Sequence, residues 1–227
     1  MPAYTAGLPE GSQVHVLNKR HVAHADRAPT RCTRAFHLAN NPRQWFSDYM
    51  EFISAQLHAA PSPPKRVLLV GVSEGAVPAI RVARSRRDIT HVAIIGDGGW
   101  TMRQSLTALA ARGALPVSVE DGWLQIAADA QSTSKQWLGN PYRWWFDVMD
   151  LDPLADYLAL TQPILVGFGE LDESVPVESA RFLENKFREV GKSNLTLVVY
   201  PGANHRLNAG SVSYRTEFFR AVSRWLD

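Results

Sequence analysis

Four short aliphatic runs constrain the fold of this chain more than any other feature. They cover residues 65–70, 91–95, 163–168 and 195–200. Nearly continuous apolar runs of this length are typical of strands that are covered on both faces, as in a parallel sheet. Because these strands alternate with helical patterns along the chain, the sequence predicts an α/β fold with a doubly wound, mostly parallel sheet.

Segments between the runs carry apolar residues at three- and four-residue spacing, which predicts amphipathic helices. The expected helices cover residues 42–59, 76–83, 177–190 and 214–226. A further strand is expected at 14–17, where apolar residues alternate with His15, so the sheet should have about five strands. Residues 20–41 are polar and irregular, and they are expected to form a long connection.

Residues 100–160 form an insertion that is too long for a simple crossover between two strands. Its patterns are mostly helical, and it holds many of the tryptophans: Trp100, Trp123, Trp137, Trp144 and Trp145. We expect a helical cap or an elaborated crossover within a single domain of residues 1–227. Its tryptophans are expected to form its core, with contact to an apolar substrate as the alternative.

The charge balance argues against several classes of partner. Lys and Arg number 24 and Asp and Glu 22, so the formal charge is only +2 and the basic residues are scattered. Neither nucleic acid nor an anionic membrane surface is therefore expected. Cys32 is the only cysteine, which excludes an intrachain disulfide, and we expect a buried or half-buried thiol.

The first residues, MPAYTAGLPEG, lack the basic and apolar regions of a secretory signal. No stretch approaches the roughly 20 apolar residues of a membrane span. A cytoplasmic protein is the default expectation.

Polar residues of three kinds follow the expected strands. Ser73 follows the run at 65–70, Glu170 and Asp172 follow the run at 163–168, and His205 follows the last run. Ligands of open α/β sheets bind beyond the carboxyl ends of the strands, where these residues should meet. A serine becomes a nucleophile when a histidine takes its proton, and a carboxylate fixes the histidine tautomer. The sequence therefore predicts Ser73, Asp172 and His205 as catalytic residues.

Two glycines surround the serine. A strand-to-helix turn that projects a serine outward forces unusual backbone angles, and we expect Gly71 and Gly75 to permit close packing around it. The start of the following helix places the backbone amide of Glu74 where it can donate to a developing oxyanion.

These loops give the chain a specific resemblance. It resembles the α/β-hydrolase family, whose nucleophile elbow, G-x-S-x-G, matches residues 71–75. The stretch 169–176, with Asp three residues before Val-Pro, is similar to the family's acid loop, and 200–205 is similar to its histidine loop. The acid and histidine loops also resemble those of dienelactone-hydrolase-like and prolyl-oligopeptidase-like members. The resemblance runs from about Val14 to the C-terminus.

Alternatives to these assignments remain open at this point. Asp97 also follows a strand, and Glu170 is two residues from Asp172, so either is an alternative acid. The G-x-G-x-x-G spacing of a dinucleotide site is absent, and no histidines have the H-x-x-x-H spacing of a helical zinc site. We therefore expect no cofactor and no metal.

The sequence has no counterpart to the first three strands of the family's sheet. Those strands supply the second oxyanion donor, from the loop after the third strand, so only the Glu74 amide can be assigned. A chain that is truncated or starts differently, a loop at 19–23 that replaces the donor, or a partner subunit would each account for this. An uncovered strand at 14–17 would favour self-association, so a homo-oligomer is expected.

The resemblance implies a serine hydrolase that cleaves a carboxylic ester or thioester, a small-molecule substrate, through an acyl-enzyme on Ser73. A peptidase or an acyltransferase of the same fold is an alternative. A non-catalytic binding module is the alternative from a different functional class, and the missing strands favour it. Neither the substrate nor the oligomeric state follows from the sequence.

Overall fold

The computed structural model describes residues 7–22 and 32–226, and the chain divides into two compact units. The sheet unit comprises Met1–His15, Ala60–Trp100 and Asp152–Asp227. The helical unit comprises Val16–Ala59 and Thr101–Leu151. The expected single domain with a cap at 100–160 stays a prediction.

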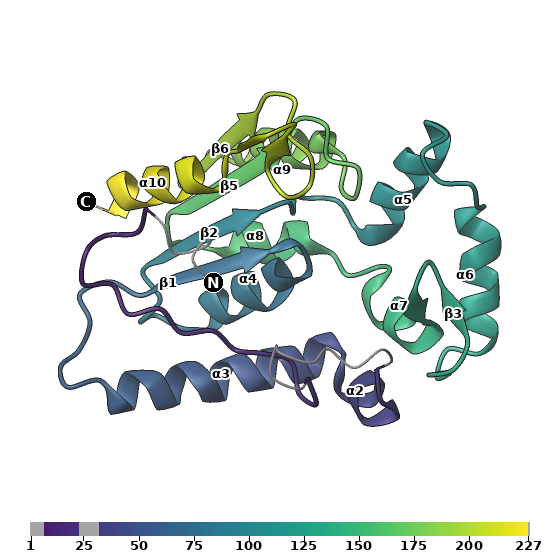
Figure 1. Ribbon diagram of the computed structural model, residues 1–227, viewed down its shortest axis with the longest axis horizontal. Helices are drawn as coiled ribbons and strands as arrows, with labels where there is room; N and C mark the ends of the chain where they lie inside the picture. Colours follow the sequence, from purple (N-terminus) through teal and green to yellow (C-terminus); the bar gives the residue numbers. More distant parts are fainter. Residues whose placement is uncertain (1–6, 23–31, 227) are drawn as a thin grey trace. The chain divides into compact units, whose positions relative to one another are not determined.

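A parallel sheet forms the centre of the sheet unit. Its strands, in the described residues, are β1 (Leu68–Val72), β2 (His91–Ile95), β5 (Ile164–Gly169) and β6 (Leu195–Tyr200). They lie in the order β1-β2-β5-β6, and every neighbouring pair is parallel, as Figure 1 shows. Strands β2 and β5 are almost wholly buried along their length, which explains their aliphatic composition. The predicted α/β class is confirmed.

Helices cover both faces of this sheet. They are α4 (Ala76–Ser85), α8 (Pro153–Ala159), α9 (Val177–Glu189) and α10 (Arg215–Leu226), with the short turn η1 (Ser73–Gly75) before α4. Helix α10 packs Phe218 and Phe219 into a core with Ile95 and Leu165 of the strands. A Cβ on Gly167 would lie 2.6 Å from the Phe218 ring, so glycine is required at that point of β5. A short antiparallel pair, β7 (Asn208–Ala209) and β8 (Val212–Ser213), precedes α10.

An aromatic core stabilises the helical unit. Its elements are α2 (Arg34–Ala39), α3 (Pro42–Ala59), α5 (Met102–Ala111), α6 (Val119–Ala128), β3 (Gln136–Trp137), β4 (Asn140–Pro141) and α7 (Tyr142–Val148). Trp45, Trp144 and Trp145 are buried in this core together with Ile126 and Met149. The expectation that tryptophans of the insertion form a core is confirmed for Trp144 and Trp145.

Three local predictions are wrong. Residues 14–17 form no strand, and Val14 and Val16 are about half exposed (47% and 50%), because no neighbouring strand pairs with them. The described sheet therefore has four strands rather than about five. Helix α2 lies inside the expected irregular connection, where the Thr33 side chain accepts a hydrogen bond from Phe36 N and caps it. Cys32 is a free thiol, but it is exposed.

None of the helices within the described ranges is long and apolar enough to cross a membrane.

Candidate active site

The nucleophile candidate sits at a strained turn. Ser73 follows β1 directly, opens the turn η1 and has a φ of 51°. A positive φ is unfavourable for a residue with a Cβ, and it raises the free energy of the folded state by roughly 1–3 kcal/mol. Ser73 is partly exposed.

Only one of the two glycines beside Ser73 is required for packing. A Cβ on Gly71 would lie 2.7 Å from the Ala76 Cα atom and 2.8 Å from the Gly75 carbonyl oxygen. Contacts this short do not occur with real side chains, so the turn depends on Gly71. A Cβ on Gly75 would meet nothing within 4 Å, and its φ is an ordinary −65°. A Cβ would therefore be excluded at Gly71 and accommodated at Gly75.

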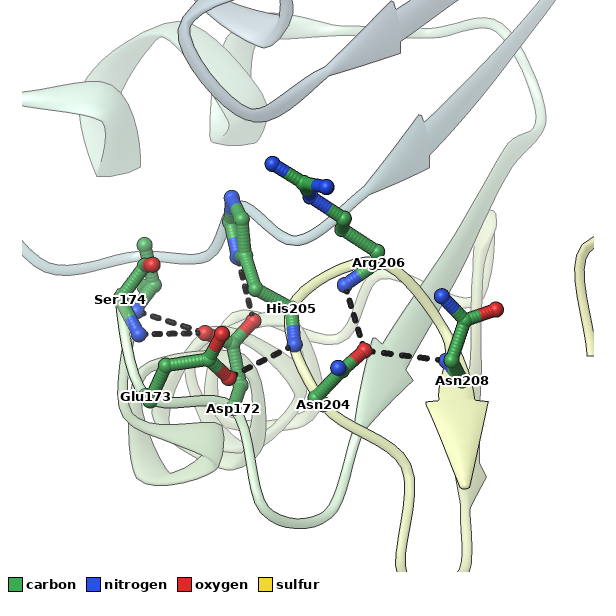
Figure 2. A network of polar contacts seen from close by, with 8 residues as sticks. Asp172, Glu173, Ser174, Asn204, His205, Arg206 and Asn208 are labelled. Atoms are coloured by element: carbon green, nitrogen blue, oxygen red, sulfur yellow. Dashed lines mark hydrogen bonds and ion pairs between the residues drawn. The ribbon is translucent and has the colours of Figure 1, made fainter. Parts of the chain in front are cut away.

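The acid loop after β5 fixes the Asp172 carboxylate through both of its oxygens. Asp172 Oδ1 accepts hydrogen bonds from Ser174 N and Val175 N, each at 2.8 Å. Asp172 Oδ2 lies 2.7 Å from His205 Nδ1. The Asp172 side chain is completely buried, so its orientation is determined by these donors and not by water. Figure 2 shows the carboxylate between the acid loop and the imidazole.

This geometry assigns roles to the two nitrogens of His205. Because Nδ1 donates to Asp172, Nε2 is the nitrogen that can accept a proton from a hydroxyl. Burial lowers the pKa of His205, but the hydrogen bond and charge of Asp172 and the charges of Glu173 and Asp97 raise it more. The net shift is upward, which favours the imidazolium that forms when His205 takes a proton.

The sheet register places Ser73 at the edge where the His205 ring lies. Strands β1 and β2 pair Val72 with Ile95, so Ser73 and Gly96 each follow a member of that pair. A Cβ on Gly96 would lie 2.9 Å from His205 Cε1, which means that the imidazole rests against the Gly96 backbone. The ends of β1 and β2 thus bring the hydroxyl and the imidazole to one edge of the sheet.

The alternative acids bind other groups. Asp97 Oδ2 accepts a hydrogen bond from Tyr157 Oη at 2.9 Å, and burial raises the pKa of Asp97 to about 7 although that bond, the Gly98 N–H and His205 oppose the shift. The pKa of the fully buried Tyr157 is raised by burial and by Asp97. Glu170 Oε2 accepts from Gly202 N at 2.9 Å. Of Asp97, Glu170 and Asp172, Asp172 is the one bonded to the imidazole.

The backbone amide of Glu74, predicted from the sequence as an oxyanion donor, lies at the start of a helix. Glu74 follows Ser73 within η1, which runs into the N-terminal end of α4. Backbone N–H groups in the first turn of a helix point towards its N-terminal end, where a developing negative charge is stabilised. The loop proposed to supply the second donor includes Ala23, which lies outside the described residues, and that proposal stays a prediction.

In the part of the chain that the structure describes, no group of three or more His, Cys, Asp or Glu side chains could hold a metal ion.

The sequence patterns missed two residues at this site. Glu173 accepts a hydrogen bond from the backbone N of His205, and Tyr157 donates to Asp97. Glu173 directly follows Asp172, so its place in the acid loop was a usable signal. Tyr157 lies in α8, outside the three loops, and nothing in its pattern indicated a polar role.

A family model supports what the three loops indicate. The model described as "Alpha/beta hydrolase family" matches residues 10–221. The chain belongs to the α/β-hydrolase family. A search of curated proteins finds no match to this sequence.

Solved structures of α/β hydrolases share the fold at low sequence identity. A monoacylglycerol lipase of Paleococcus ferrophilus is 19% identical with a TM-score of 0.51; the match covers 80% of this chain and 74% of the lipase. A Pyrococcus furiosus esterase is 16% identical with a TM-score of 0.57, covering 83% of this chain and 63% of the esterase. An acylaminoacyl peptidase of Pyrococcus horikoshii is 13% identical with a TM-score of 0.56, covering 86% and 29%.

Proposed function

We propose that this α/β hydrolase is a serine hydrolase that cleaves a carboxylic ester or thioester through an acyl-enzyme on Ser73. The observation that carries the proposal is the 2.7 Å hydrogen bond from His205 Nδ1 to the buried Asp172 carboxylate. That bond prepares Nε2 as a base at the sheet edge where Ser73 leaves β1. Glu170 and Asp97, the other candidate acids, are engaged elsewhere.

In the proposed reaction, the Ser73 hydroxyl attacks the substrate carbonyl while His205 Nε2 takes its proton. Asp172 stabilises the resulting imidazolium. The tetrahedral intermediate carries its negative charge towards the backbone N–H of Glu74, at the N-terminal end of α4. His205 then protonates the leaving alcohol or thiol, and an acyl-enzyme remains. Water, deprotonated by the same imidazole, releases the acid and restores Ser73.

Two neighbours named a lipase and an esterase support the choice of an ester substrate, and one named a peptidase keeps an amide open. An acyltransferase differs only in the nucleophile that releases the acyl group. The non-catalytic alternative requires that the hydroxyl of Ser73 is not activated, which is a measurable difference.

The deciding experiment is labelling with a fluorophosphonate probe. The folded chain should be modified at Ser73, located by mass spectrometry, and Ser73→Ala should remain unlabelled. The labelled protein should lose its activity on p-nitrophenyl esters in proportion to the modification. A folded chain that neither reacts with the probe nor hydrolyses these esters would support the binding module instead.

A further inference from the structure

The acid loop contacts the histidine loop through three carboxylates, and one that has no part in the proposed reaction, Glu173, bonds to His205 itself. Glu170 Oε2 accepts from Gly202 N at 2.9 Å, and Asp172 Oδ2 accepts from His205 Nδ1 at 2.7 Å. Glu173 Oε2 accepts from the backbone N of His205 at 3.1 Å. Figure 2 shows Glu173 and Asp172, adjacent in sequence, both bonded to His205.

We propose that Glu173 is a positioning residue that holds the main chain of His205 and places a second negative charge beside its imidazole. This inference rests on the proposed function, in which His205 is the base. The role differs from that of Asp172, because Glu173 contacts the backbone and not the reacting ring.

The two contacts constrain different motions of His205. The bond from Nδ1 to Asp172 fixes the rotation of the ring, while the bond from the backbone N to Glu173 fixes the position of its Cα atom relative to the acid loop. Other bonds between the two loops reach Gly202 and Ala203, from Glu170 and the Leu171 N–H, so the Glu173 contact is the one that holds the main chain at His205 itself. Without it, the main chain at His205 could shift and carry Nε2 away from Ser73. Small displacements of a base reduce the rate strongly, because proton transfer requires hydrogen-bond distance.

The histidine loop is itself stiff, so a contact at one point can position all of it. Asn204 Oδ1 accepts from Arg206 N and Asn208 N, each at 3.0 Å, and Asn204 N donates to Asn208 O at 2.9 Å. Leu207 is fully buried and has a φ of 56°, which fixes the turn that follows. Holding the His205 backbone therefore holds a preformed turn and not a loose segment.

Charge adds a second effect. The carboxylates whose charges act on His205 are Asp172, Glu173 and Asp97, and the neighbouring Arg206 is the cation of the same loop. Glu173 is exposed, so water and salt weaken its charge more than that of buried Asp172. Its negative charge raises the pKa of His205 and stabilises the imidazolium that forms during proton transfer.

The test compares Glu173→Gln, Glu173→Ala and the matched control Glu170→Gln. Glutamine at 173 keeps an oxygen acceptor and removes the charge. Alanine removes both and should lower kcat about tenfold, the size expected for one hydrogen bond involving a charged group. Glu170→Gln removes a comparable exposed carboxylate from the same pair of loops, but its partner is Gly202 and not His205.

The first readout is the pH profile of kcat/KM on a p-nitrophenyl ester. His205 must be neutral to act as base, so activity rises as pH passes through its pKa. Removing the Glu173 charge lowers that pKa, and the acidic limb should move to lower pH in Glu173→Gln. The limb should stay in place in Glu170→Gln. Equal movement in both variants, or none in Glu173→Gln, would overturn the proposal.

The second readout separates this inference from the proposed function. Titration of the His205 ring by NMR, with His205→Gln used to assign the signal, needs no substrate. A lower His205 pKa in Glu173→Gln supports the charge effect even if no ester is cleaved, whereas an unchanged value refutes it whatever the activity. A ring signal that broadens in Glu173→Ala, with an unchanged melting temperature, supports the positioning effect; a sharp, unshifted signal contradicts it.

Discussion

The sheet unit and the helical unit both carry surface ion pairs, but they differ in their least exposed carboxylate residues. Asp156 and Asp172, the least exposed carboxylate residues among those described, both belong to the sheet unit, and each is bonded to nitrogen donors. In the helical unit, Asp150 is about half exposed and pairs with Arg103 at the surface. A buried charge has no water to replace a lost partner, so its geometry is fixed. We therefore expect a change at the carboxylate bonded to His205 to alter chemistry, and changes in the helical unit to alter stability alone.

The largest effect is expected from Asp172→Asn in the sheet unit. Asparagine retains the volume and an oxygen for Ser174 N and Val175 N, but it cannot hold His205 in the required tautomer. Ester hydrolysis should fall about 10³- to 10⁴-fold in kcat. Asp156→Asn is the control, since it also removes a buried carboxylate from this unit and should reduce stability without this loss. If the kcat of Asp172→Asn is within tenfold of the parent value, Asp172 does not act in the mechanism.

The next largest effect is expected from Trp145→Ala in the helical unit. The buried Trp145 ring packs edge-to-face against Trp137 and Trp144, with ring centroids 4.9 and 4.7 Å away. Its removal leaves a cavity and should lower the free energy of unfolding by about 3–5 kcal/mol, measured by urea denaturation. Leu124→Ala, at an exposed position on α6, should change it by about 0.5 kcal/mol or less. Equal effects at both positions would show that the aromatic core is not what stabilises this unit.

Asp97 should make the stability of the sheet unit depend on pH, an effect smaller than that of Trp145→Ala. Burial raises its pKa to about 7 in the folded chain, against about 4 for an unfolded aspartate. Between these values the folded chain binds more protons than the unfolded chain, so stability decreases as pH rises through this window. In Asp97→Asn that contribution is absent. As the pH is raised from about 4 to about 8, the melting temperature of this variant should therefore fall less than that of the parent. Parallel curves would show that Asp97 is ionised in the folded chain.

The smallest effect is expected at the surface of the helical unit. Arg103 contacts Asp150 through two hydrogen bonds, at 2.7 and 2.8 Å. A double-mutant cycle with alanine at both positions should give a coupling of about 1 kcal/mol or less, because the pair is partly exposed and screened by salt. A coupling above about 2 kcal/mol would mean that this unit, too, depends on fixed charge geometry.

Much of the sheet unit could be predicted from sequence because its strands are buried on both faces. The run predicted at 195–200 is strand β6 to the residue, and that at 163–168 is β5 displaced by one. The run predicted at 65–70 begins three residues later in the structure, at Leu68, after the charged Lys65 and Arg66. In these strands, the number of consecutive apolar residues in the sequence predicts the length of the buried strand.

Other features could not be predicted from the sequence, because the structure that a local pattern adopts depends on the residues that lie next to it in space. The alternation at 14–17 is typical of a strand, but a strand forms only where another edge accepts its hydrogen bonds. Gly75 is part of the motif, yet only Gly71 faces atoms that exclude a Cβ. Glu173 is an exposed glutamate in a loop, and its bond to His205 depends on a loop 32 positions away in the chain.

The φ of 51° at Ser73 also has a consequence for how this chain would change under selection. Glycine is the residue that tolerates this angle best, so Ser73→Gly should leave a folded chain at least as stable as the parent. A population screened for heat resistance alone would therefore accumulate the variant without a hydroxyl, and only a screen for turnover would retain the serine. If serine is retained at this turn over generations, selection has acted on the reaction that its hydroxyl performs and not on stability.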